Sequence, residues 1–332
     1  MLIDRRNVVN FLVALSFLVC TGAPAAQAAT DEKQKLAIAV EEMRSLYRSL
    51  IPSAGTGEEV RAIKNIATQA NEPTRTIPLR IYFPSKAAEQ TNLPIFLFMH
   101  GGGFVSGDLE THDVLLRAIS NGAGCIVVSV DYRLAPENPF PAGLEDGYAA
   151  LLWSKDNAAT FGGDSAKIIV GGDSAGGNLT AALAILSRDR KGPKILGQWL
   201  MYPTLSNKMD TESWAKLGET HFPTREVNTM IITAYVPDGK TPYEPLIAPL
   251  WANLENLPPA LVQAGGFDPL SDENKDFVQK MQQSGNTAEF LFYPEFQHGF
   301  IQFYQDGKNF PGAETALRQG ISWLQKVFYS GE

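Results

Sequence analysis

Residues Gly172-Asp173-Ser174-Ala175-Gly176 decide the fold of this chain, because of the segments on either side of them. The apolar residues 167–171 predict a buried strand, and the Ala/Leu-rich residues 178–186 predict a helix. A sharp strand-to-helix turn with serine at its apex is the setting of a nucleophile elbow, in which the glycines avoid collisions with the neighbouring elements. Ser174 is therefore a candidate covalent nucleophile. A tight turn without chemistry explains the glycines as well, so the interpretation depends on partners elsewhere in the chain.

A second glycine cluster predicts where an oxyanion would be held. His100-Gly101-Gly102-Gly103-Phe104 follows a predicted apolar strand over residues 94–99. Glycines in this position let backbone N–H groups point into a site, and we expect Gly102, Gly103 and Ala175 to be the donors. The alternatives are a flexible turn or a phosphate-binding loop. A phosphate loop is disfavoured because the chain has no G-x-x-x-x-G-K-[ST] and no helix-opening G-x-G-x-x-G with an acid about 20 residues on.

The general base is found by elimination among four histidines. Nucleophile, acid and base follow one another along chains with this kind of elbow, which leaves His221 and His298. His221 lies in a segment without strand pattern and is interpreted as a surface or lid residue. His298 lies in a predicted loop over residues 295–300, directly after a strand-like run over 288–294. His298 is the predicted base.

The acid that orients this imidazole is chosen by position, because many carboxylates lie between the serine and the histidine. Residues 259–265 predict a core strand, and Asp268 lies in the turn that leaves it. Sites in open α/β sheets gather at such strand ends. Asp272 and Glu273 open the next helix and are explained by the helix dipole. Asp268 is the predicted acid, with Asp272 as the reserve.

Five separated motifs together resemble the hormone-sensitive-lipase-like family of bacterial carboxylesterases, in its G-D-S-A-G branch. They are residues 100–104, 131–137, 172–178, 268–270 and 298–300, within a resemblance that covers about residues 92–328. The resemblance implies an α/β-hydrolase fold with a helical cap, and a mechanism without metal or cofactor. By position it implies a triad of Ser174, Asp268 and His298, with an oxyanion hole of Gly102, Gly103 and Ala175.

The pattern of strands and helices agrees with that fold class. Strands are predicted at residues 79–83, 94–99, 126–131, 168–170, 198–202, 260–264 and 289–293, with helical segments between most of them. This alternation predicts an α/β fold with a mostly parallel, doubly wound sheet flanked by helices.

Two segments are assigned to the cap, residues 29–60 and 204–248. The first contains Leu36, Val40, Met43, Tyr47 and Leu50 at helical spacing, which also fits a helix packed on the core. In the second segment the regular spacing of apolar residues is lost directly after the carboxyl end of the strand predicted at 198–202. We therefore expect an insertion that covers the active site. An ordinary surface excursion is the alternative.

Residues 1–28 are interpreted as a secretory signal peptide. Arg5-Arg6 precedes an apolar run over 8–20, and Ala26-Gln27-Ala28 forms an A-x-A cleavage site. The run is shorter than the roughly 20 residues of a membrane span, so no stable anchor is expected after cleavage. The predicted location is periplasmic or secreted, with twin-arginine export as an option. Cleavage leaves Cys125 alone, a predicted buried thiol without an intrachain disulfide.

The length and net charge of the chain indicate which kinds of molecule it binds. The remaining residues 29–332 suffice for one α/β-hydrolase domain. The formal net charge of −8 disfavours nucleic acid and anionic membrane surfaces. The expected partner is a small ester substrate, and a monomer or a homodimer is equally compatible.

The predicted function is a serine carboxylesterase that hydrolyses short- to medium-chain acyl esters through an acyl-enzyme. We expect acyl chains of up to roughly eight to ten carbons, beside the rings of Phe104 and Phe300. An amidase or lactonase with the same triad is the alternative, because pocket shape sets the leaving-group preference. A non-catalytic binding protein on this scaffold is disfavoured, since it would be expected to lose a triad member.

Overall fold

The computed structural model describes residues 25–71, 74–86, 91–236 and 239–329. Within them an eight-stranded sheet has the order β1-β2-β4-β3-β5-β6-β7-β8. β1 and β2 are antiparallel to each other, β2 is antiparallel to β4, and the remaining pairs are parallel. The strands are β1 (Ala62–Asn71), β2 (Thr74–Phe83), β3 (Leu93–Met99), β4 (Ile126–Val130), β5 (Gly163–Asp173), β6 (Gly197–Met201), β7 (Ala260–Phe267) and β8 (Ala288–Gln297).

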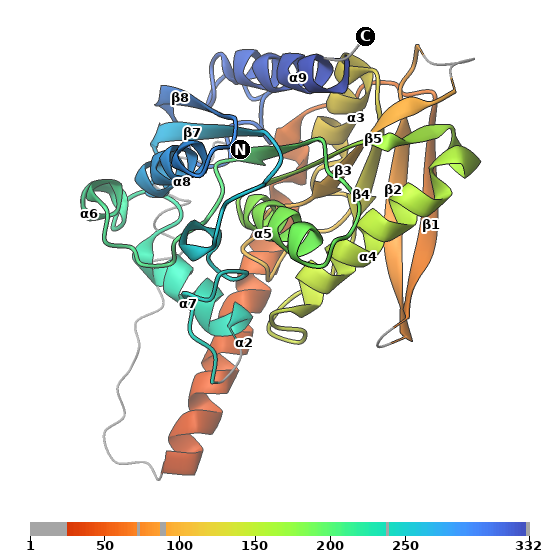
Figure 1. Ribbon diagram of the computed structural model, residues 1–332. Coiled ribbons are helices and arrows are strands. Elements are labelled where there is room, and N and C mark those ends of the chain that lie inside the picture. The colour runs from red at the N-terminus through yellow and green to blue at the C-terminus, as the bar shows by residue number, and fades with distance from the viewer. Residues whose placement is uncertain (1–24, 72–73, 87–90, 237–238, 330–332) are drawn as a thin grey trace.

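Helices cover both faces of this sheet (Figure 1). One face carries α3 (Asp113–Ala123) and α9 (Ala313–Tyr329), which share a hydrophobic cluster with Phe96 and Phe98. The opposite face carries α4 (Ala142–Asn157), α5 (Ala175–Asp189) and α8 (Ser271–Gln283) over a second cluster. The predicted fold class, a mostly parallel and doubly wound sheet flanked by helices, is confirmed.

The central strands explain why the sheet is buried on both sides. Every residue of β3, Leu-Pro-Ile-Phe-Leu-Phe-Met, is buried, as expected for a parallel strand between two helix layers. Side chains alternate between the two clusters, because successive residues of a strand point to opposite faces. β5 lies between β3 and β6, with Gly172 paired to Met99. The turn after β5 therefore lies at the centre of the sheet's carboxyl edge.

The segments predicted to form the cap, residues 29–60 and 204–248, contain helices joined by irregular chain. The first holds η1 (Ile51–Ala54) and most of α2 (Ala25–Ser49), which begins four residues earlier, and the second holds α6 (Glu212–Leu217) and α7 (Arg225–Tyr235). The remaining short helices are η2 (Ala158–Phe161) and η3 (Pro249–Trp251). Figure 1 shows α2 beside α7, and the two helices are in contact. Thr211 and Thr224 cap α6 and α7 by accepting backbone N–H groups with their side chains.

One strand was missed, and β2, β5, β7 and β8 are longer than predicted, with β5 beginning at Gly163 and ending at Asp173. β1 was not predicted, because only one of its faces is apolar enough to signal a strand and it pairs along the sheet edge. β2 begins at Thr74, earlier than expected, for the same reason. β8 continues to Gln297, so the predicted loop over 295–300 begins only at His298. Backbone pairing with β7 extends the strand beyond its apolar residues.

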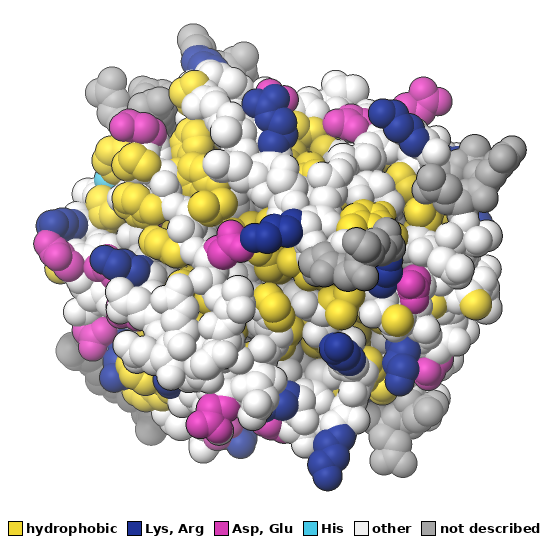
Figure 2. Space-filling model, turned by 45° about the horizontal axis from the view of Figure 1, so that its top comes forward, with side chains coloured by type: hydrophobic (Ala, Val, Ile, Leu, Met, Phe, Trp, Pro, Cys, Tyr) yellow, Lys and Arg dark blue, Asp and Glu magenta, His cyan; other side chains and the backbone are white. Residues whose placement is uncertain are grey.

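Residues 1–24 of the predicted signal peptide lie outside the described residues, so export stays a prediction. In the described part of the chain, none of the helices combines the length and apolar character needed to cross a membrane. Figure 2 shows Lys and Arg interspersed with Asp and Glu on the face that it presents. Cys125 is buried and carries a free thiol, as predicted.

Candidate active site

Ser174 lies in a strained turn between β5 and α5. Its backbone has φ 53° and ψ −118°, a positive φ that residues other than glycine adopt only where the surroundings enforce it. Its N–H donates to the Met201 carbonyl at 2.8 Å, which ties the turn to β6. A Cβ added to Gly176 would collide with the Met99 carbonyl, and one added to Gly172 with the Gly176 carbonyl. The turn therefore needs both glycines, for the steric reason that the sequence predicts.

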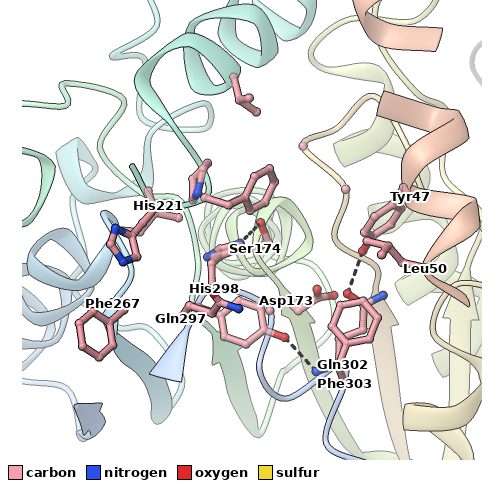
Figure 3. A pocket seen from close by; sticks show the side chains of 18 of the residues that line it. Tyr47, Leu50, Asp173, Ser174, His221, Phe267, Gln297, His298, Gln302 and Phe303 are labelled. Atoms are coloured by element: carbon pink, nitrogen blue, oxygen red, sulfur yellow. Dashed lines mark hydrogen bonds between the residues drawn. The ribbon is translucent and has the colours of Figure 1, made fainter. Parts of the chain in front are cut away.

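Three of the predicted residues are joined by hydrogen bonds. His298 Nε2 lies 2.8 Å from Ser174 Oγ (Figure 3). His298 Nδ1 lies 2.7 Å from Asp268 Oδ2. Asp268 is fully buried, and its other oxygen accepts the Leu270 N–H at 2.9 Å. The strand ends of β5, β7 and β8 thus bring together side chains that lie far apart in the sequence. An imidazole placed in this way can take the serine proton while the carboxylate fixes its orientation.

The glycine loop after β3 lies beside the serine. Gly102 has φ +117° and Gly103 φ +63°, and both line the same pocket as Ser174 and Ala175. The Gly102 carbonyl accepts both the N–H and the hydroxyl of Ser106, at 2.9 and 2.8 Å. Among the described residues, the amides of Gly102, Gly103 and Ala175 have no hydrogen-bond acceptor. Free N–H groups around a nucleophile can stabilise a developing negative charge.

A buried carboxylate that the sequence analysis did not single out supports this loop. Asp173 Oδ1 accepts the Gly101 N–H at 2.7 Å and lies 2.9 Å from His112 Nε2. Burial raises the pKa of Asp173, but the His112 imidazole and the Gly101 amide outweigh burial and hold the pKa below its usual value. The charged carboxylate thereby fixes the first glycine of the loop. Its only sequence signal is its place within the elbow, which does not reveal its partners.

His100 holds the same loop from the other side. Its carbonyl accepts the Tyr132 hydroxyl at 2.7 Å, and its Nδ1 lies 2.8 Å from the Gly101 carbonyl. Burial is the main cause that lowers the pKa of His100 to about 4, so the ring is neutral near pH 7. A neutral imidazole can donate from Nδ1 to the Gly101 carbonyl, which makes His100 a structural part of the loop.

His221, which was set aside as the base, and Asp272, the reserve for the acid, contact other partners. His221 Nδ1 lies 2.9 Å from Thr220 Oγ1, and its ring stacks on Phe267 at a centroid distance of 5.7 Å. His221 lines the pocket, and its Nδ1 contacts Thr220 rather than Ser174. Asp272 accepts the N–H of Ser213 at 2.8 Å.

The expectation that Phe104 and Phe300 flank the substrate was wrong. Both rings are buried and neither lines the pocket. Phe104 stacks on Tyr235 at 3.8 Å, and Phe300 stacks on Phe296 at 4.8 Å. A ring next to a catalytic motif gains more from full burial against other rings than from exposure in a pocket.

The pocket above Ser174 has a volume of about 760 Å³ and is lined from both the sheet edge and the cap. α2 and α7 contribute apolar side chains, among them Met43 and Ile231. Figure 3 shows Tyr47 of α2 reaching Gln302, whose Oε1 accepts the tyrosine hydroxyl at 3.1 Å. In the described part of the chain, no cluster of three or more His, Cys, Asp or Glu side chains could hold a metal ion.

Comparisons with known proteins point to one family. The profile of the α/β-hydrolase fold family matches residues 96–302. Carboxylesterase NlhH of Mycobacterium tuberculosis is 38% identical over 258 residues, which cover 76% of this chain and 79% of the relative. An arylesterase of Saccharolobus solfataricus is 34% identical over 249 residues, 74% of this chain and 79% of the relative.

Solved structures agree in fold. A thermostable carboxylesterase cloned from a metagenomic library superposes with a TM-score of 0.80 at 35% identity, covering 88% of this chain and 97% of that one. An ester hydrolase from the metagenome of Lake Arreo, solved with a bipyridine phosphonate derivative, gives a TM-score of 0.82 at 30% identity. That match covers 99% of both chains.

Proposed function

The chain belongs to the α/β-hydrolase fold family and is a carboxylic ester hydrolase of the hormone-sensitive-lipase-like type, and we propose on this premise that Ser174, His298 and Asp268 form its catalytic triad. One observation carries the proposal. The hydrogen bonds run without interruption from Asp268 through His298 to Ser174, and the last two of these residues line the pocket of about 760 Å³.

The proposed reaction passes through an acyl-enzyme. Ser174 Oγ attacks the ester carbonyl while His298 Nε2 takes the serine proton. The amides of Gly102, Gly103 and Ala175 donate to the oxyanion of the tetrahedral intermediate. His298 then gives its proton to the alcohol as the C–O bond breaks. A water molecule, deprotonated by the same imidazole, releases the carboxylic acid and restores Ser174. Because the imidazole must start neutral, activity is expected to fall in acid.

The cap supports a preference for short to medium acyl chains. A Cβ placed on Gly103 would lie 2.6 Å from Ile231 Cδ1 and 3.1 Å from Met43 Cε, so these side chains close the space directly above the glycine loop. Each enclosed CH₂ gains about 0.8 kcal/mol only while the pocket can surround it. We therefore propose that acyl chains fit up to roughly eight to ten carbons.

Two measurements test these assignments. Labelling with diethyl p-nitrophenyl phosphate, followed by peptide mass spectrometry, is expected to place one diethylphosphoryl group on Ser174. A label on another serine would overturn the nucleophile. The kcat/KM values for p-nitrophenyl esters from C2 to C16 are expected to peak at C10 or below, and Ile231→Ala is expected to move the peak to a longer chain. A wild-type peak at C14 or C16 would contradict the proposal that the pocket encloses acyl chains of only about eight to ten carbons.

A further inference from the structure

Three rings form one wall of the pocket, leading from the proposed triad toward solvent. The ring of Phe222 lies at a centroid distance of 5.7 Å from the His298 imidazole. The ring of its chain neighbour His221 lies at a centroid distance of 5.7 Å from Phe267, and these two rings are only 12° from parallel. All three residues line the pocket that holds Ser174. We call Phe222, His221 and Phe267 the aromatic wall.

Phe267 has the most accessible ring of the aromatic wall. Its side chain is 45% exposed, whereas His221 and Phe222 are partly buried. Its backbone pairs with Gln297 at the end of β7, directly before Asp268 of the proposed triad, so the strand fixes its position. A large apolar side chain that lines a pocket and stays exposed contributes free energy when a bound molecule removes its surface from water.

The His221 ring is held in a fixed place beside Phe267. The His221 N–H donates to the Leu217 carbonyl at 2.9 Å, and its Nδ1 lies 2.9 Å from Thr220 Oγ1. Aromatic rings prefer offset-stacked or edge-to-face arrangements with centroids about 4.5–7 Å apart. A fixed pair of nearly parallel rings therefore presents flat faces and ring edges in the orientation that a further flat ring needs.

The chemistry of the reaction assigns the aromatic wall to the alcohol part of the ester. His298 Nε2 must give its proton to the leaving oxygen, so the alcohol part lies on the side of this imidazole. The carbonyl oxygen faces the amides of the glycine loop, which leaves the remaining direction to the acyl chain. Figure 3 shows His221 and Phe267 on one side of Ser174, and Tyr47 of α2 on the other.

We propose that the aromatic wall binds a flat ring in the alcohol part of the substrate, so that esters of phenols and of arylmethyl alcohols are preferred over esters of saturated alcohols. The ring stacks on Phe267 and His221 while the leaving oxygen meets His298. A saturated ring of the same size buries a similar area but has no flat π-face to stack. The inference rests on the proposed function, since it concerns the ester that Ser174 attacks.

Pairs of esters with equal carbon skeletons provide the test. In the alcohol arm, benzyl butanoate is compared with cyclohexylmethyl butanoate. In the acyl arm, ethyl phenylacetate is compared with ethyl cyclohexylacetate. The measured quantity is the ratio of kcat/KM for the aromatic ester to that for its saturated partner, in wild type, Phe267→Leu and His221→Leu. Leucine keeps an apolar side chain without a flat ring, and comparison with wild type cancels the intrinsic reactivity of each ester.

The expected result in the alcohol arm is a ratio that falls about fivefold in Phe267→Leu, equal to about 1 kcal/mol, and falls in the same direction in His221→Leu. Phe267→Tyr keeps the flat ring and is expected to keep the ratio. Phe292→Leu is the matched control. Phe292 is likewise an exposed ring, 50% exposed on the neighbouring strand β8, but it lies outside the set of residues that line the pocket. Its substitution is expected to leave the ratio unchanged.

Two results would overturn the proposed role of the aromatic wall. One is a ratio in the alcohol arm that stays within twofold of wild type in both variants. The other is a fall confined to the acyl arm, because the rings would then face the acyl chain. Failure of the proposed function has a different signature. In that case wild type hydrolyses none of the four esters, or Ser174→Ala hydrolyses them as well as wild type does.

Discussion

The residues at the sheet edge and the helices of the cap are held in place by different kinds of contact. At the edge, backbone N–H groups fix the proposed nucleophile and the glycine loop: the Ser174 N–H is bonded to β6, and the Gly101 N–H to buried Asp173. In the cap, side chains at least partly exposed to solvent make the connections, such as Arg44 of α2 to Glu137. Backbone contacts between close-packed strands leave little room for adjustment, whereas exposed side-chain contacts are weak and replaceable. We therefore expect changes at the edge to remove the chemistry and changes in the cap to alter binding.

The largest effect is expected for Ser174→Ala at the sheet edge. Because triad residues act as a unit, kcat is expected to fall by a factor on the order of 10⁵–10⁶. The substitution removes the hydroxyl oxygen and adds no atom that could collide with its surroundings, so the thermal unfolding temperature should stay close to that of wild type. Turnover of p-nitrophenyl butanoate measures the loss. A variant with a tenth of wild-type kcat would mean that another nucleophile performs the reaction.

A smaller loss is expected for Gly102→Ala in the glycine loop. A new Cβ would collide with the Ser106 carbonyl, and φ +117° disfavours any L-residue, so the loop must shift and misplace its N–H groups. Loss of one oxyanion donor lowers kcat by about 10²–10³. Gly124→Ala is the matched control, since Gly124 also has a positive φ of 64° but an added Cβ meets no atom within 4 Å. Equal kcat values for the two variants would argue against an oxyanion role for the loop.

The same contrast explains how much the sequence could predict. Ser174, Asp268 and His298 follow apolar strands in recognisable local patterns, so their meeting at one sheet edge could be inferred from the order of strands and turns. The contacts that support these three residues could not be inferred from the sequence. Arg44 and Glu137 are 93 positions apart and Gly101 and Asp173 are 72 apart, and only the finished fold makes each pair neighbours.

The fold was predictable to a similar degree. The central strands are apolar on both faces and stood out, whereas β1 pairs along the edge with half of its side chains in solvent. Local sequence also could not show which aromatic rings enter the pocket. Phe104 and Phe300 lie in the catalytic motifs but pack into the protein, because their neighbours in space offer better burial.

A buried carboxyl group, that of Glu273, lies between the sheet edge and the cap and is expected to make the free energy of unfolding depend on pH. Glu273 of α8 is 1% exposed and accepts the N–H groups of Leu205 and Ser206, where the chain leaves the sheet edge for the cap. Burial raises the pKa of Glu273 from 4.5 to about 7, against the lowering effect of these backbone donors. Between pH 4.5 and pH 7 the Glu273 carboxyl keeps its proton in the folded protein but has lost it in the unfolded chain. Rising pH therefore lowers the free energy of unfolding, which levels off above pH 7.

Glu273→Gln removes this titration but keeps an oxygen that can accept both N–H groups. The free energy of unfolding of the variant, relative to wild type, is expected to rise by about 2 kcal/mol between pH 5 and pH 8. Urea unfolding at the two pH values measures the difference. Glu226→Gln serves as the control, because Glu226 is exposed at the start of α7. The same stability difference at both pH values would contradict a titrating Glu273.

The smallest effect is expected in the cap, for Arg44→Ala. Arg44 donates to the Val105 carbonyl at 2.8 Å and to the Ala135 carbonyl at 3.2 Å, besides its ion pair with Glu137. These bonds attach α2, which lines the pocket, to the end of the glycine loop. The ion pair is partly exposed and contributes at most about 1 kcal/mol, and each backbone contact contributes a similar amount.

Loosening α2 by Arg44→Ala is expected to raise KM about three- to tenfold while kcat changes less than twofold, because the groups at the sheet edge stay in place. Arg48→Ala is the matched control on the same helix, since Arg48 is 72% exposed and its nearest carboxylate, Asp108, is 3.4 Å away. If Arg44→Ala lowered kcat as strongly as Gly102→Ala does, the cap would belong to the catalytic machinery and the contrast between the two regions would fail.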